Sequence, residues 1–90
     1  MKDFVDVATD VARLVQQKND AYGNSFAISG DFLRLLYPKG MMPNQYDDAL
    51  TFVRMFDKMC RLATSPDAFN EDPRRDMLGY AILNVARMEE

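Results

Sequence analysis

The segment from residue 47 to 62, which reads DDALTFVRMFDKMCRL, constrains the fold most because its apolar residues recur with the period of an α-helix. At about 100° per residue they form one broad stripe, made up of Ala49, Leu50, Phe52, Val53, Phe56, Met59 and Cys60. Asp57 falls inside the edge of this stripe, where an amphipathic helix does not normally carry a carboxylate. The segment therefore predicts a long helix, and Asp57 is its first candidate for a functional residue.

Two further segments in the first half of the chain have helical patterns. Residues 3–20 carry apolar residues at three- and four-residue spacing and begin with Asp3, a residue type suited to an N-cap. Gly23 is expected to end this helix. Residues 26–29 then form a connector, and residues 31–36 form one or two helical turns.

The last helix is predicted to begin at Asp72, with Pro73 as its first residue, and to run to about Met88. It is apolar on nearly every side, which is typical of a helix in the centre of a bundle. No segment alternates like a β-strand. We therefore expect one all-α domain over residues 1–90, a small bundle of three long helices and one short one with antiparallel neighbours.

Size and composition predict an oligomer. A chain of 90 residues that folds alone buries only about 60–65% of its extended surface, yet 48% of its residues are hydrophobic. Part of the apolar surface is thus expected to lie between subunits of a homo-oligomer. The seven methionines and six phenylalanines fit this interpretation.

Charge and residue types exclude several functions. The net charge is −3 and no basic run is longer than the pair Arg74–Arg75, so nucleic-acid binding is disfavoured. The absence of histidine excludes histidine-based catalysis and the common zinc sites. The single cysteine, Cys60, is expected to be a reduced core residue. No signal peptide or membrane-spanning run is seen, so we expect a cytoplasmic protein that does not enter a membrane.

Three carboxylates could converge if the 47–62 helix and the last helix pack antiparallel. Asp72, Asp76 and Tyr80 share one face of the last helix, and Asp57 would approach the two aspartates. Converging oxygen ligands suit Mg²⁺ or Mn²⁺. The basic side chains beside them would suit the phosphates of an anionic ligand: Arg54, Lys58 and Arg61. The arrangement could support a metal–polyphosphate site.

Each of these carboxylates also has a purely structural interpretation, and the sequence leaves both open. Asp72 can serve only as an N-cap. Asp57 can pair with Arg54 or Arg61 in a partly buried network. Asp76 can favour the helix N-terminus or pair with an arginine of the preceding helix.

Three segments together resemble a known family. Residues 18–23 read KNDAYG, residues 54–62 read RMFDKMCRL and residues 72–80 read DPRRDMLGY. In this order they resemble the nucleotide modification associated domain family, which is found largely in phages and their hosts. That family is itself similar to the all-α nucleoside triphosphate pyrophosphohydrolases of the MazG and dimeric dUTPase type. The resemblance spans roughly residues 15–83.

The resemblance implies a MazG-like helical bundle, completed by oligomerisation, that binds a nucleotide through Mg²⁺. It implies Asp57, Asp72 and Asp76 as metal ligands, with Asp57 and Asp76 as the catalytic candidates. The residues that would hold the nucleotide and its phosphates are Lys18, Asn19, Tyr22, Arg54, Lys58, Arg61 and Tyr80. The pyrophosphohydrolases usually carry a glutamate-rich ExxE motif, whereas residues 44–63 contain no glutamate, which leaves hydrolysis open.

Three functional hypotheses follow. The first is a Mg²⁺-dependent nucleotide-binding protein of phage nucleotide metabolism, working in the host cytoplasm, with hydrolysis to the monophosphate and pyrophosphate as its potential reaction. The second is a non-enzymatic, small acidic protein that binds a host or phage partner protein, such as a defence or replication factor. The third is a purely structural oligomerising unit.

Overall fold

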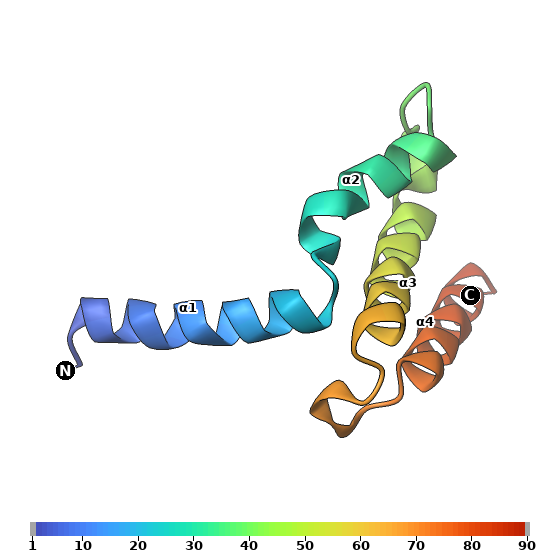
Figure 1. Cartoon of the computed structure of the whole chain (residues 1–90). Helices are drawn as coiled ribbons and strands as arrows, with labels where there is room; N and C mark the ends of the chain where they lie inside the picture. Colours follow the sequence, from blue (N-terminus) through green and yellow to red (C-terminus); the bar gives the residue numbers. More distant parts are fainter. Residues whose placement is uncertain (1, 90) are drawn as a thin grey trace.

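The computed structural model describes residues 2–89, and all regular structure in that range is helical. It contains four α-helices and two short 3₁₀ turns: α1 (Phe4–Ala21), α2 (Ser25–Leu36), η1 (Pro43–Gln45), α3 (Tyr46–Thr64), η2 (Ala68–Asn70) and α4 (Pro73–Met88). The predicted all-α class is confirmed. Helices α3 and α4 lie side by side and antiparallel, α2 lies along the start of α3, and α1 extends away from the other three (Figure 1).

Local sequence signals set the starts of α1 and α4 as predicted. The Asp3 side chain accepts a hydrogen bond from the Val5 backbone N–H at 2.7 Å and caps α1. Asp72 caps α4 in the same way, accepting from the Arg74 N–H at 3.0 Å, and Pro73 is the first residue of the helix. Asp72 therefore has the capping role that was its structural interpretation.

The connector predicted at residues 26–29 is wrong, because α2 already begins at Ser25 and runs for 12 residues. Gly23 and Asn24 both adopt left-handed backbone conformations with φ of 60°, and together they complete the turn after α1. A side chain at Gly23 would collide with the hydroxyl of Thr64 at the end of α3. The turn between α1 and α2 therefore sits against the end of α3, where only glycine fits.

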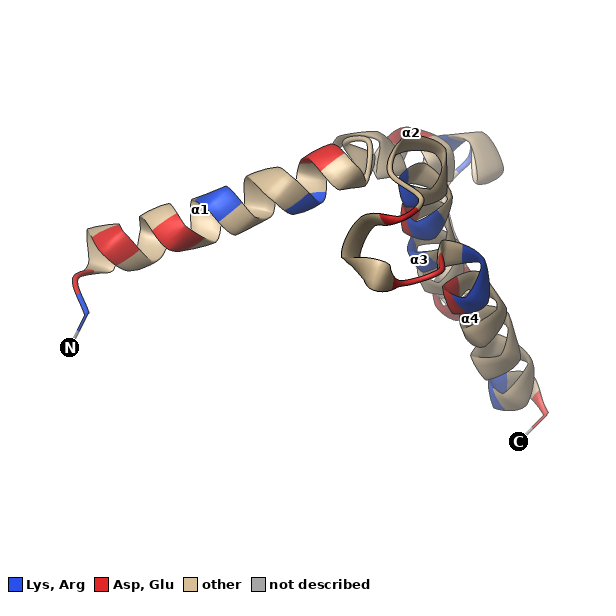
Figure 2. Cartoon of the chain, turned by 60° about the horizontal axis from the view of Figure 1, so that its bottom comes forward, with Lys and Arg blue, Asp and Glu red and all other residues tan. Residues whose placement is uncertain are grey.

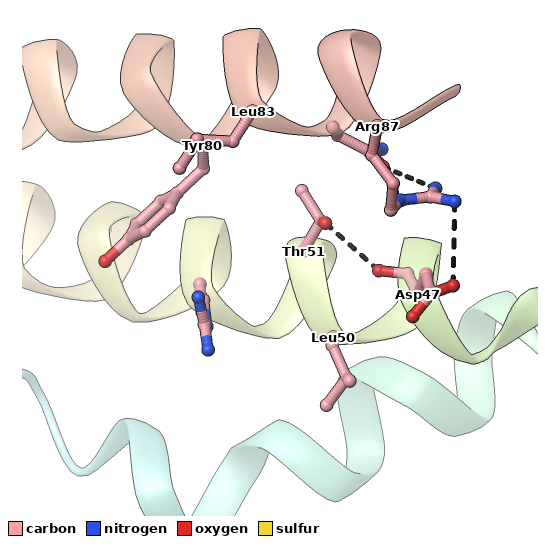
Figure 3. Close-up of a pocket in the computed structure, with 8 residues that line it drawn as sticks. Asp47, Leu50, Thr51, Tyr80, Leu83 and Arg87 are labelled. Carbon is pink, nitrogen blue, oxygen red and sulfur yellow. Dashed lines mark hydrogen bonds and ion pairs between the residues drawn. The ribbon is translucent and has the colours of Figure 1, made fainter. Parts of the chain in front are cut away.

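Polar and aromatic contacts join α2, α3 and α4. The Phe32 ring of α2 stacks on Phe56 of α3, with ring centroids 4.4 Å apart and an angle of 9° between planes. At the other face of α3, Arg87 reaches Asp47 at 3.5 Å (Figure 3). Arg87 also reaches Asp48 at 3.3 Å. These contacts tie the end of α4 to the start of α3.

The expectation that α4 lies in the centre of a bundle is wrong within one chain. Its side facing away from α3 is open: Leu78 is 61% exposed, and Ile82 and Val85 are also exposed. The reason is that α3 supplies the main packing contact with α4, so only one side of an all-round apolar helix is covered.

The stripe of α1 is also uncovered. Its apolar residues are all exposed: Phe4, Val5, Val7, Val11, Leu14 and Val15. The radius of gyration is 16.0 Å, whereas a compact domain of this length would have about 12 Å. The chain is therefore extended rather than closed around one core.

Within residues 2–89, we find no helix with both the length and the apolar character needed to cross a bilayer.

Candidate ligand cavity and charged cluster

A cavity of about 620 Å³ lies where α1, α2 and α3 meet. Four of the residues predicted for the functional site line it: Lys18, Asn19, Tyr22 and Asp57. The remaining lining residues are Val15, Ser25, Phe26, Ser29 and Val53. Residues from separate parts of the sequence thus meet at one cavity, whereas the other predicted site residues do not line it.

The turn after α1 explains how these side chains share one cavity. Lys18 and Asn19 lie in the last turn of α1 and Tyr22 is its C-cap. Because the chain then turns at once into α2, Ser25 and Ser29 follow four residues apart on one helix face. The sequence prediction missed both serines because it placed Ser29 in a connector and began the next helix only at residue 31, although the spacing of Ser25 and Ser29 is helical.

A second cluster lies next to the cavity and joins three elements. The Lys58 ammonium of α3 is 3.1 Å from an Asp76 carboxylate oxygen of α4 and 5.7 Å from the centre of the Tyr22 ring. Burial lowers the pKa of Lys58, but the Asp76 carboxylate and Tyr22 more than compensate, and the net effect is a raised pKa. Lys58 therefore remains a cation, shared between a carboxylate and an aromatic ring.

Cys60 behaves as a packing residue. Burial, followed by the nearby charge of Asp57, raises the pKa of its thiol above the ordinary value. A thiol in this state is a weak nucleophile at neutral pH. Cys60 is half-buried rather than fully in the core, and its reduced state stays a prediction.

Two predicted ligand residues lie away from the cavity, in a groove between α3 and α4. The guanidinium carbon of Arg54 is 5.9 Å from the centre of the Tyr80 ring. Both residues line a space of about 200 Å³, whose far end is closed by Arg87 and Asp47 (Figure 3). Arg54 and Tyr80 therefore contact one another rather than the ligand cavity.

Arg61, which was predicted to contact phosphates, does not line the cavity and instead binds the segment before α4. Its side chain is fully buried, and its guanidinium donates to the Glu71 carboxylate at 3.3 Å and also to the Glu71 backbone carbonyl. The contact fastens the segment between η2 and α4 onto the end of α3. Sequence reasoning did not identify Glu71, since its partner lies ten residues earlier, across an irregular loop.

The predicted convergence of Asp57, Asp72 and Asp76 is not formed in one chain. Asp72 caps α4, Asp76 pairs with Lys58, and Asp57 lines the cavity. Among the described residues, no three His, Cys, Asp or Glu side chains are grouped to hold a metal ion. The carboxylates of a single copy thus do not fit a preformed Mg²⁺ site, and Mg²⁺ binding stays a prediction.

Comparison of the chain with protein-family models, with curated proteins and with solved structures gives no match.

Proposed function

We propose that this chain is a nucleotide-binding protein and that the cavity between α1, α2 and α3 holds the nucleotide. The observation that carries the proposal is the meeting of Lys18, Asn19 and Tyr22 with Asp57 around one cavity. Lys18, Asn19 and Tyr22 belong to one segment of the sequence, and Asp57 belongs to another that lies more than thirty residues later. A homo-oligomer of MazG-like type, acting in phage nucleotide metabolism in the host cytoplasm, is the setting that the resemblance implies for this proposal.

The cavity has the chemistry of a nucleoside site. Its volume is within the range of about 300–1,000 Å³ that small-molecule sites occupy. Val15, Phe26 and Val53 supply apolar walls for the face of a base, and Tyr22 supplies a second ring.

Polar groups at the same cavity suit the rest of a nucleotide. The Asn19 amide and the hydroxyls of Ser25 and Ser29 can hydrogen-bond to base edges or a sugar. Lys18 offers a cation for a phosphate. Asp57 is the one carboxylate among the lining residues, so any Mg²⁺ would enter mainly on the phosphates of the nucleotide.

Thermal unfolding with a panel of nucleoside triphosphates, each with and without Mg²⁺, tests this proposal. A ligand at a hundredfold excess over its dissociation constant stabilises the folded state by about 2.7 kcal/mol. We expect one nucleotide to raise the midpoint, and Lys18→Ala and Tyr22→Ala to abolish the rise. Arg54→Ala is the matched control, since Arg54 lies outside the cavity, and it should keep the rise.

A flat response across the panel would overturn the nucleotide proposal. A rise that depends on Mg²⁺ and is lost in Asp57→Asn would add the metal to it. Release of pyrophosphate by the wild-type chain, measured with the stabilising nucleotide, is the separate test of hydrolysis.

The second candidate function is the non-enzymatic protein that binds a host or phage partner. The exposed apolar residues of the loop before α3, Met41 and Met42, favour it. This candidate predicts that biological activity survives Asp57→Asn and Asp76→Asn but fails when Met41 and Met42 are replaced by serine. The nucleotide proposal predicts instead that activity survives the serine replacements and fails with Lys18→Ala and Tyr22→Ala.

A further inference from the structure

Within residues 2–89, two apolar faces have no covering element. The first is the α1 stripe, where Phe4 is 77% exposed and Val11 52% exposed. The second is the outer face of α4, where Leu78 and Ile82 lie four residues apart and are both about three-fifths exposed. Exposed apolar surfaces of this extent mark sites of protein association.

The exposed area shows how much surface is left to cover. The chain exposes 7,065 Å², whereas a compact monomer of 10.3 kDa would expose about 5,400 Å². The excess is about 1,700 Å² per copy, and a standard interface needs only about 800 Å² from each partner. An interface of the obligate class, more than 2,000 Å² in total, therefore fits the uncovered surface.

Gly79 gives a second indication on α4. Glycine in a helix interior weakens the helix relative to alanine, so a close neighbour usually explains it. A Cβ added at Gly79 would have no heavy atom within 4 Å in this chain. The element that would approach Gly79 is thus not part of the same copy.

One residue of opposite charge lies near each face, Asp6 on α1 and Arg75 on α4. Asp6 lies in the first turn of α1, and Arg75 lies in the first turn of α4, one helical turn from Leu78 and Gly79. Neither side chain makes an ion pair with any residue from 2 to 89. Figure 2 shows acidic residues on the first half of α1 and basic residues at the start of α4.

We propose that a second copy of this chain covers the apolar faces of α1 and α4, so that two incomplete copies share one core. A symmetric pair presents the same faces from both partners, so the α1 and α4 faces of one copy can both be covered by the other copy.

The second copy also completes the ligand cavity, in a step that rests on the proposed function. The α1 stripe continues into the cavity through Val15, and Phe26, another lining residue, is 93% exposed. A helix of the second copy laid along the α1 stripe would supply the missing wall above these two side chains.

Light scattering with size-exclusion chromatography of the full chain tests the interface. We expect a mass of at least twice 10.3 kDa for the wild type, and a fall to one copy in Val11→Glu and Ile82→Glu. Gln17→Glu is the matched control, because it adds the same carboxylate to the polar face of α1, and it should keep the wild-type mass.

A wild-type mass of one copy across about a hundredfold range of concentration would overturn the proposal. The proposal would also be overturned if the Val11→Glu and Ile82→Glu variants stay helical and keep the mass of an oligomer. If both variants lose their helical circular dichroism, the wild type decides: a helical signal that falls on dilution supports the shared core, and one that does not change contradicts it.

The nucleotide part has a separate readout. An oligomer that shows no nucleotide-dependent stabilisation would remove the proposed function and leave the interface standing. If a nucleotide does bind, Val11→Glu should weaken its binding at least tenfold while Gln17→Glu does not. Equal binding by both variants would show that the second copy does not complete the cavity.

Discussion

Helix α3 of the α3–α4 hairpin and helix α1 both have clear apolar periodicity, but only α3 is covered by neighbouring helices. In the hairpin, α3 has partners on two sides, and Arg61 is fully buried against the segment leading to α4. In α1, the helix stripe has no partner along most of its length, and only Ala21 at its last residue is buried. The difference shows that periodicity identifies the apolar face of a helix, whereas burial of that face depends on another element that packs against it.

The largest expected effect tests the anchored end of the hairpin. Arg61→Ala removes a fully buried side chain and both of its bonds to Glu71, and should lower the free energy of unfolding by about 3 kcal/mol. Urea unfolding measures this loss. Arg54→Ala, an exposed arginine on the same helix, should cost less than about 1 kcal/mol. Equal effects would show that the Arg61 contact does not stabilise the hairpin.

The next effect tests whether α1 differs from the hairpin in the assembled protein. Leu14→Ala should cost about 2 kcal/mol per copy if a second copy buries the stripe. If Leu14 stays exposed in the protein, Leu14→Ala should change the free energy of unfolding by no more than about 0.5 kcal/mol. Thermal unfolding at several protein concentrations measures the loss, with Gln17→Ala as the control on the polar face. No loss at any concentration would leave α1 as an exposed helix.

A smaller effect concerns the Lys58–Asp76 ion pair that joins the hairpin to Tyr22. Because the folded state raises the pKa of Lys58 above 10.5, the pair stabilises the fold fully below that pH. The stabilisation is lost as the pH rises through the raised pKa. Urea midpoints measured across this alkaline range should therefore fall more steeply for the wild type than for Lys58→Met.

At neutral pH we expect Lys58→Met to cost about 1 kcal/mol. Lys39→Met, which changes an exposed loop lysine, is the control and should keep the wild-type pH dependence. Identical alkaline slopes for the wild type and Lys58→Met would show that Lys58 is not the group responsible.

The smallest expected effect is that of Gly79→Ala on thermal stability. Its sign depends on whether a second copy crosses α4 at this residue. In an isolated chain, Gly79→Ala meets open space and should stabilise the helix by up to about 1 kcal/mol. If a helix of a second copy crosses at Gly79, the added methyl group separates the helices and the oligomer becomes less stable. The midpoint of thermal unfolding relative to the wild type gives the sign, and a clear stabilisation would argue against the crossing.

The sequence was sufficient where a feature is local. The caps at Asp3 and Asp72 and the all-α class follow from residue types and spacing. The length of α2 was not predicted from residue types and spacing. The two left-handed residues Gly23 and Asn24 turn the chain in less space than a connector needs, so α2 begins earlier.

Pairings between elements were predictable only as alternatives. Asp76 was expected as a metal ligand, as a favourable charge at the helix N-terminus or as the partner of an arginine of the preceding helix, and it pairs with a lysine, Lys58. The contact between Arg61 and Glu71 depends on the path of an irregular loop, which periodicity does not define. Four of the cavity residues were already implied by the family resemblance: Lys18, Asn19, Tyr22 and Asp57.

Hydrogen exchange of the α1 backbone amides, compared with those of α3 at high and at low protein concentration, tests the shared core most directly. Most of the stability of a helix in a protein comes from packing of its apolar face, so lasting protection of α1 requires a covering surface. The account predicts that α1 amides are protected as strongly as α3 amides at high concentration and lose that protection on dilution. Rapid exchange of α1 at every concentration, with α3 still protected, would contradict it.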